Sequence, residues 1–276
     1  MPNKGLSLHI GLNRVDPAHY GGWDGALTAC EYDANDMEAL AKARGFKPQK
    51  LLTAQGTSPA VINALRQAAA KLKSGDLFFL SYSGHGGQVP DTNHDEGEAD
   101  RQDETWVLYD RQLIDDELWA LWKQFKAGVR ILVLSDSCHS GTVVKAMPPF
   151  LNAGPGAGPA PRVKLLPPAQ AAKVYQQNRA LYDGLQKEYP AGENVRVRAS
   201  VLLISGCQDN QYSWDGNRNG RFTEKLRKVW NSGKFVGAYR PFRNKIASLM
   251  PVSQTPNYYK VGAANGAFEA QKPFTI

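Results

Sequence analysis

Short apolar runs alternate with segments of helical periodicity along most of the chain, and this alternation constrains the fold more than any other feature. The apolar runs are typical of buried strands, and they occupy residues 6–13, 76–86, 130–138 and 199–208. The segments with helical periodicity occupy residues 29–44, 58–75, 115–128, 220–233 and 238–250. The order strand, helix, strand, helix predicts an α/β protein with a mostly parallel sheet that is covered by helices on both faces.

Local signals set several of the predicted helix boundaries. Ser58 is a favourable N-cap residue, Pro59 suits the first helical turn, and Gly75 is a typical residue after a helix. Gly45 gives the same signal at the end of the helix predicted from residue 29.

Residues 147–170 interrupt this pattern. They are rich in Pro, Gly and Ala and have no periodicity, so we expect a long exposed loop. The loop divides the chain into a larger part, residues 1–146, and a smaller part, residues 171–276. Because the apolar run after the loop needs a sheet to join, we expect one domain over residues 1–276.

Charge and cysteine content argue against several classes of protein. The net charge is +7, but the basic residues are scattered and form no block of five, which argues against a nucleic-acid partner. Cys30, Cys138 and Cys207 lie far apart without zinc-binding spacing, so neither disulfides nor zinc are expected. The chain lacks a run of eighteen apolar residues and a signal-peptide pattern at its start. We expect a cytoplasmic protein that does not enter a membrane.

Two of the predicted strands end in residues with reactive side chains. His85 follows one strand and Cys138 follows another, and the carboxyl ends of parallel strands meet at one edge of a sheet. Cysteine next to histidine is typical of a nucleophile with its base. His139 is a poor candidate base for Cys138, because adjacent side chains on a strand point to opposite faces. The alternative reading is a structural cysteine beside a turn histidine.

The glycines after the histidine fit the same chemistry. Gly86 and Gly87 let backbone N–H groups approach a carbonyl closely, and with the N–H of Cys138 they would form an oxyanion hole.

The segments "SYSGHGGQ" and "LSDSCHSG" resemble the His and Cys motifs of the caspase-like cysteine peptidases, more closely those of metacaspases and orthocaspases. The resemblance continues through "ALTACEYDANDM", "LIDDELW", "LISGCQDNQYSWDG", "GRFTEKL" and "QTPNY" and so covers most of the chain. It implies a caspase-like three-layer α/β/α sandwich and peptide hydrolysis through an acyl-enzyme. It also implies Cys138 as nucleophile and His85 as general base and acid, without a third triad residue and with His139 structural.

The same resemblance implies a substrate pocket lined by Cys30, Asp33, Ser83 and Asp136. Two carboxylates around one pocket would bind a cation and repel an acidic side chain, and a guanidinium can bridge both. We therefore expect cleavage after Arg or Lys. The alternative readings are a solvated carboxylate for Asp33 and a turn residue for Ser83.

The acidic stretch at residues 91–105 is a candidate metal site. Its spacing fails the EF-hand pattern, because Gly97 is one place late and Gln102 stands where a bidentate Glu belongs. The resemblance to metacaspases implies calcium binding by Asp103, Asp115 and Asp116, although this chain has Lys145 where the family has an acidic residue. A solvated charged loop is the ordinary alternative.

These observations predict a monomeric cysteine endopeptidase that acts on peptides or proteins after Arg or Lys. It would require no cofactor, with Ca²⁺ as the candidate activator. Two other functions stay open: a catalytically silent caspase-like scaffold that binds partner proteins, and a peptide ligase on the same fold. If basic residues are accepted, Arg162 and Lys164 in the loop are candidate sites of self-cleavage.

Overall fold

The computed structural model describes residues 2–92, 101–138, 162–189, 196–208 and 211–276. A six-stranded sheet runs through its centre in the order β2-β1-β3-β7-β8-β9. Neighbouring strands are parallel except for β9, which runs antiparallel to β8 at one edge. The strands are β1 (Gly5–Gly11), β2 (Lys47–Leu52), β3 (Leu77–Ser83), β7 (Arg130–Asp136), β8 (Ser200–Ser205) and β9 (Tyr259–Gly262).

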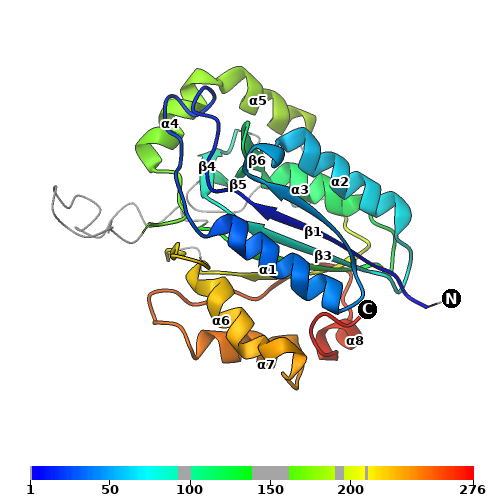
Figure 1. Cartoon of the computed structure of the whole chain (residues 1–276). Coiled ribbons are helices and arrows are strands. Elements are labelled where there is room, and N and C mark those ends of the chain that lie inside the picture. Colours follow the sequence, from blue (N-terminus) through cyan, green and yellow to red (C-terminus); the bar gives the residue numbers. More distant parts are fainter. Residues whose placement is uncertain (1, 93–100, 139–161, 190–195, 209–210) are drawn as a thin grey trace.

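Helices cover both faces of the sheet (Figure 1). Every residue of β3 and β7 is buried, so both faces of these strands need a covering layer. One face packs against α1 (Cys30–Ala43), α6 (Arg221–Trp230), α7 (Tyr239–Ala247) and α8 (Gly266–Ala270). The other face packs against α2 (Ser58–Lys71) and α3 (Asp115–Lys123). The predicted mostly parallel three-layer α/β/α sandwich is confirmed.

A second, antiparallel sheet lies beyond the carboxyl ends of the central strands, in the order β4-β5-β6. Its strands are β4 (Gly86–Pro90), β5 (Gln102–Val107) and β6 (Gln112–Ile114). It shares a small apolar core with α4 (Pro168–Gln177) and α5 (Arg179–Glu188). The described residues also form two short 3-10 helices, η1 (Thr53–Gln55) and η5 (Asn231–Gly233). Sequence periodicity did not predict this sheet or its two helices.

The structure corrects two local predictions. Thr57, not Ser58, is the N-cap of α2, and its side chain accepts a hydrogen bond from the N–H of Ala60. The predicted exposed loop at 147–170 is wrong for its described end: the side chains of Lys164 and Leu166 are buried, and α4 begins at Pro168. Specific long-range contacts hold this end, and local composition does not reveal them. Residues 147–161 lie outside the described part of the chain.

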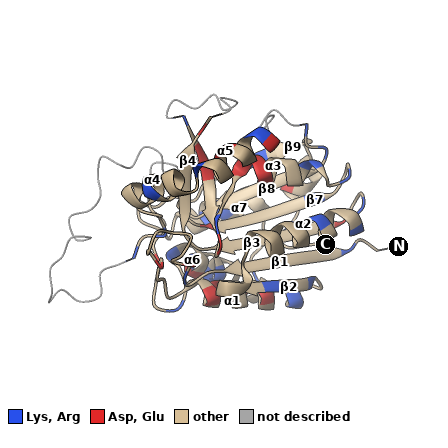
Figure 2. Cartoon of the chain, turned by 90° about the horizontal axis from the view of Figure 1, so that it is seen from above, with Lys and Arg blue, Asp and Glu red and all other residues tan. Residues whose placement is uncertain are grey.

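Acidic and basic residues are interspersed over the helices rather than sorted onto separate faces (Figure 2). Within the described residues, no helix is both long and apolar enough to cross a bilayer.

Candidate active site

Strands β3 and β7 are neighbours, and Ser83 and Asp136 are paired at their carboxyl ends. Just beyond these ends the chain places His85 and Gly86 on one side and Cys138 on the other. The two segments touch through their backbones, because a Cβ on Gly86 would lie 1.6 Å from the carbonyl oxygen of Cys138. A glycine is therefore required at position 86 for the two strand ends to approach each other.

His85 is buried and held from two sides. Its Nε2 lies 2.9 Å from the carbonyl oxygen of Gly25, and because a carbonyl can only accept, Nε2 carries the hydrogen. Its Nδ1 has no hydrogen-bond partner among the described residues. The ring of Trp23 packs against the imidazole at a centroid distance of 4.8 Å. Burial lowers the pKa of His85 to about 4, partly opposed by the carbonyl of Gly25, so the ring is neutral near pH 7 and Nδ1 can accept a proton.

Cys138 is fully buried at the end of β7. The N–H of Ser213 donates to its Sγ at 2.7 Å, and the thiol lies 3.5 Å from the carbonyl oxygen of the same residue. The neighbouring Ser137 bonds to Ser135 at 2.9 Å between their Oγ atoms, as expected if Ser137 faces away from Cys138. His139 lies outside the described residues.

The two N–H groups expected to form an oxyanion hole point at one oxygen atom. Gly86 and Cys138 both donate to the carbonyl oxygen of Lys164, at 3.0 and 3.1 Å. This is the arrangement that would stabilise a developing oxyanion. The N–H of Gly87, also considered for this role, is not among the described backbone donors to this oxygen.

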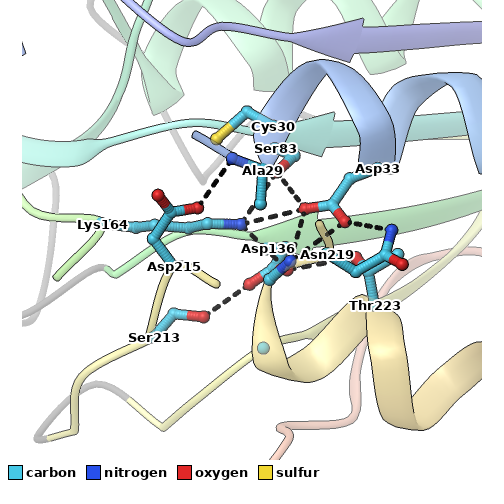
Figure 3. A network of polar contacts seen from close by, with 12 residues as sticks. Ala29, Cys30, Asp33, Ser83, Asp136, Lys164, Ser213, Asp215, Asn219 and Thr223 are labelled. Atoms are coloured by element: carbon cyan, nitrogen blue, oxygen red, sulfur yellow. Dashed lines mark hydrogen bonds and ion pairs between the residues drawn. The ribbon is translucent and has the colours of Figure 1, made fainter. Parts of the chain in front are cut away.

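The side chain of the same lysine fills the predicted pocket (Figure 3). Its Nζ lies 3.1 Å from Asp33 Oδ2, 3.0 Å from Asp136 Oδ2 and 2.9 Å from Ser83 Oγ. Burial alone would lower the pKa of Lys164, but the neighbouring acids, Asp136 foremost, raise it well above its usual value. The ammonium group is therefore charged and fully buried, with both carboxylates as partners.

Both carboxylates are held by further donors from the loop and helix after β8. Asp33 accepts from Asn219 Nδ2 at 2.9 Å and from the N–H of Gly220 at 3.1 Å. Asp136 accepts from Ser213 Oγ at 2.5 Å and from Thr223 Oγ1 at 3.1 Å. Burial, with a contribution from the charge of Asp136, raises the pKa of Asp33 to about 6.

Gly220 forms one wall of the pocket. A Cβ there would lie 2.3 Å from Asp136 Oδ2, 2.3 Å from Lys164 Nζ and 3.0 Å from Asp33 Oδ2. The absence of a side chain at this position is what leaves room for a cationic side chain between the carboxylates.

Cys30, the fourth predicted pocket residue, is the buried first residue of α1 and lies next to the pocket (Figure 3). Burial raises the pKa of its thiol, and the positive charge of Lys164 opposes this shift. Cys30 therefore contributes an uncharged wall rather than a charged partner. The structure thus brings Cys30, Asp33, Ser83 and Asp136 together around one lysine.

The predicted calcium ligands lie elsewhere. Asp103 is on β5, and Asp115 and Asp116 begin α3. Within the described residues the structure assembles no group of three acidic, His or Cys side chains that could hold a metal ion. These positions therefore give no support for a metal-dependent step, and the calcium site stays a prediction.

Sequence reasoning assigned no role to several residues that the structure places here. Ser213 and Asp215 lie in "SWDG", and Gly220 begins "GRFTEKL"; both segments carried the family resemblance, so a signal existed. The carboxylate of Asp215 accepts from the N–H groups of Thr28 and Ala29, at 2.7 and 3.1 Å, just before α1. Gly25 acts through its carbonyl, which side-chain patterns do not reveal.

Comparison with known proteins identifies the family. The Caspase domain family matches residues 14–263. The chain is 28% identical to Metacaspase-1 of Mycosarcoma maydis over 81% of its length and 31% identical to Metacaspase-1 of Saccharomyces cerevisiae over 79%. It spans 60% and 56% of the lengths of these two relatives.

Two solved structures share the fold of this chain. Protein GSU0716 from Geobacter sulfurreducens is 51% identical, with a TM-score of 0.89 over 99% of this chain and 98% of that one. Caspase-1 from Spodoptera frugiperda, at 11% identity, shares the fold with a TM-score of 0.57 over 94% of this chain and 86% of that one. The chain therefore belongs to the caspase-domain family of cysteine peptidases and is a relative of the metacaspases.

Proposed function

We propose that this chain is a cysteine endopeptidase that cleaves peptide bonds after Lys or Arg. One observation carries the proposal: a lysine sits with its ammonium between Asp33 and Asp136 while its carbonyl oxygen accepts from the N–H groups of Gly86 and Cys138. A peptide bound for cleavage must satisfy both conditions at once, because one residue supplies the recognised side chain and the attacked carbonyl.

In the proposed reaction, His85 Nδ1 takes the proton of the Cys138 thiol, and the thiolate attacks the carbonyl carbon of the bound residue. The N–H groups of Gly86 and Cys138 stabilise the oxyanion. The C–N bond then breaks, and the proton on His85 passes to the leaving amine. Water hydrolyses the thioester and restores the thiol. The carbonyl of Gly25 orients His85 throughout, in the place where a triad has its third side chain.

Charge decides the specificity. An acidic side chain would bring a third negative charge to Asp33 and Asp136, and a like-charge contact costs several kcal/mol, where about 1.4 kcal/mol is already tenfold in rate. A guanidinium can donate to both carboxylates at once, so we expect Arg to exceed Lys modestly.

The proposal places the enzyme as a monomer in a reducing compartment such as the cytoplasm, with peptide or protein substrates. All three cysteines, each in the described part of the chain, are buried and outside any disulfide, which supports a reducing compartment. Activation by calcium is part of the proposal without support from the described residues.

The test is turnover of matched acetylated peptides that end in Arg, Lys or Asp before a fluorogenic amine, with and without calcium. We expect turnover after Arg and Lys, none after Asp, and none with Cys138→Ala. Preference for Asp would overturn the specificity, and no turnover of any peptide would favour the scaffold alternative. Adding a second peptide with a free amine, followed by product masses, separates hydrolysis from ligation.

A further inference from the structure

The indole of Trp23 contacts both partners of the hydrogen bond that orients the proposed base. Its ring lies 4.8 Å from the imidazole of His85, measured between centroids, at an interplanar angle of 59°. Its second contact is the backbone of Gly25, where a Cβ would lie 2.8 Å from Trp23 Cη2. The carbonyl of the same glycine accepts from His85 Nε2 at 2.9 Å. A change in the indole would therefore reach the imidazole and its acceptor together.

The position of the Gly25 carbonyl depends on this contact. Gly25 has a φ of +56°, a left-handed conformation that favours glycine, and the indole fills the space that a Cβ would need. The chain is held on both sides of it, because the N–H of Val15 donates to the carbonyl of Asp24 at 2.9 Å and the N–H of Leu27 donates to the carbonyl of Asn13 at 2.8 Å. These bonds fix the flanks, and the indole packs against the glycine itself.

The indole also forms part of the cover over the imidazole. Only 5% of His85 is exposed, whereas Trp23 is half-buried. Burial is the largest influence on the pKa of His85 and lowers it to about 4. An imidazole that lost this cover would be hydrated and would bind a proton more readily. Loss of the indole would thus favour a protonated His85, which cannot take the thiol proton.

Charged and polar groups act on His85 from several elements. After burial, the ammonium of Lys164 also lowers its pKa, whereas the carboxylate of the exposed Asp24 raises it. Two carbonyls raise it as well, those of Gly25 and Leu165. The thiol of Cys138 is the titratable group at the end of the neighbouring strand. The indole is uncharged, so replacing it changes the hydration of the imidazole and leaves the charge of the site unchanged.

The loop of residues 16–25, which carries the indole, is held by α4 and runs beside this helix in Figure 1. Lys173 Nζ donates to the carbonyl of Gly21 at 2.9 Å, and Gln170 Nε2 donates to the carbonyl of Tyr20. The carbonyl of Tyr20 also accepts from the backbone N–H of the tryptophan at 3.1 Å, and the two aromatic rings meet edge to face at 6.1 Å. A shift of α4 is therefore transmitted along the loop to the indole.

We infer that Trp23 is a positioning residue for the base: it keeps the Gly25 carbonyl against His85 and water away from the imidazole, and α4 holds the loop that carries it. The inference rests on the proposed function and adds a residue that acts through His85 rather than on the substrate. A helix that packs on the second, antiparallel sheet then supports the reactivity of a group at the edge of the central sheet.

The first measurement needs no peptide turnover. The Cε1–H resonance of His85 is followed against pH by NMR in Cys138→Ala protein and is assigned by its absence in His85→Asn. We expect a pKa near 4 with Trp23 in place, and a pKa raised toward the ordinary value of 6.5 in Trp23→Ala. Trp23→Phe keeps an aromatic ring over the imidazole and should restore the low pKa. Trp119→Ala, which removes a half-buried indole from α3, is the matched control and should leave His85 unchanged.

The second measurement is kcat and KM for an acetylated Arg peptide as a function of pH. Trp23→Ala should lower kcat at neutral pH by about 10-fold and change KM by less than about 2-fold, because the base contributes only in the transition state. The decrease of kcat in acid should move to higher pH, in step with the pKa of His85. Protonation of Asp33 is read separately, since it weakens binding and appears in KM.

The third measurement tests the support by α4. The double variant Gln170→Ala/Lys173→Ala keeps the buried residues of this helix, so it should fold. We expect the same changes as in Trp23→Ala but smaller, with kcat lowered about 3-fold, the range for loss of hydrogen bonds. Lys187→Ala, which removes an exposed cation from α5, is the matched control.

An unchanged His85 pKa in folded Trp23→Ala would overturn the inference and leave the proposed function standing. An equal loss of kcat in Trp119→Ala would show general destabilisation and overturn it as well. If Trp23→Ala does not fold, the double variant on α4 decides, because an unchanged kcat and an unchanged His85 pKa there would contradict the role of the loop. A wild type that turns over no peptide would contradict the proposed function, and the NMR titration would still test the inference.

Discussion

At the ends of β3 and β7, the proposed reacting groups are held mainly by backbone atoms, whereas the carboxylates of the pocket beside them are held mainly by side chains. The carbonyl of Gly25 fixes His85, and the N–H of Ser213 binds Cys138. Asp33 and Asp136 instead depend on side-chain donors such as Asn219 and Thr223. A backbone scaffold tolerates changes of sequence around it, so the chemistry should survive changes that alter the pocket. Changes in the two regions are therefore expected to separate reactivity from recognition.

The largest effect is expected at the reaction centre. Cys138→Ala should lower kcat/KM on Arg peptides by about 10⁴-fold or more, because no other group supplies the nucleophile. His85 substitutions should cost nearly as much, and His139 substitutions far less. Cys207→Ala is the matched control, a buried thiol in the same apolar cluster whose Sγ lies 3.5 Å from the carbonyl oxygen of Ser137, and it should keep near-normal turnover. Equal losses at His85 and His139 would contradict the assignment of the base.

The next largest effect is expected in the pocket. A substitution there should impair recognition of the basic side chain without changing the reactivity of the Cys138 thiol. Gly220→Ala places a methyl group 2.3 Å from the position of the cation, so we expect kcat/KM on Arg and Lys peptides to fall about 100-fold or more. The rate of Cys138 alkylation by a small reagent should change little. Gly184→Ala in α5 has open space around its new Cβ and serves as the control. Normal turnover by Gly220→Ala would contradict the assignment of Gly220 to the wall of the pocket.

Neutralising one carboxylate should have a smaller effect, since the other stays. We expect Asp33→Asn and Asp136→Asn each to lower kcat/KM on Arg peptides by about 10- to 100-fold, the range for loss of one charge-assisted bond. The loss should appear mainly in KM. Full activity of Asp136→Asn on an Arg peptide would contradict the role of Asp136 in binding the basic side chain. The melting temperatures of each variant and of the wild type show whether the variant is folded.

The smallest effect concerns pH. The pKa of Asp33 is raised to about 6, so lowering the pH through 6 protonates this carboxylate and weakens binding of a cation. The pKa of His85 is lowered to about 4, so the base stays neutral over the same range. Below pH 6 we expect kcat/KM on Arg peptides to fall by at most about tenfold per pH unit. In Asp33→Asn this decrease in kcat/KM below pH 6 should disappear. If the decrease stays the same, a group other than Asp33 causes it.

The same two regions differ in how far they could be predicted from sequence. Cys138, His85 and Gly86 stand out because they directly follow apolar strands, and strand ends meet at one edge of a parallel sheet. The pocket residues required the family resemblance, because Asp33 and Asp136 come from a helix and a strand far apart in the chain. The structure brings Asp33, Ser83 and Asp136 to one cavity and places Cys30 beside it, and their role in binding substrate stays a prediction.

Other features left little local signal. Strand β4 begins with two glycines and β6 has three residues, so neither shows a clear strand pattern. Lys164 follows a Pro/Gly-rich stretch, and its partner Asp33 is 131 positions away, a pairing that periodicity cannot indicate. Composition predicted exposure for Lys164, but two buried carboxylates supplied the free energy to bury it.

Ser213 joins the two regions, since its N–H binds the Cys138 thiol, its carbonyl binds the backbone of Lys164, and its hydroxyl binds Asp136. Any displacement of this residue is therefore transmitted to the Cys138 thiol, the backbone of Lys164 and the pocket carboxylate Asp136 together. A substitution of Ser213 would change reactivity and recognition together, so a gain in one would be coupled to a loss in the other. Evolution or engineering of cleavage specificity therefore has little freedom at this position. Asn219 and Thr223 each donate to one of the two pocket carboxylates, Asp33 and Asp136 respectively. At these two positions, specificity can change independently of reactivity.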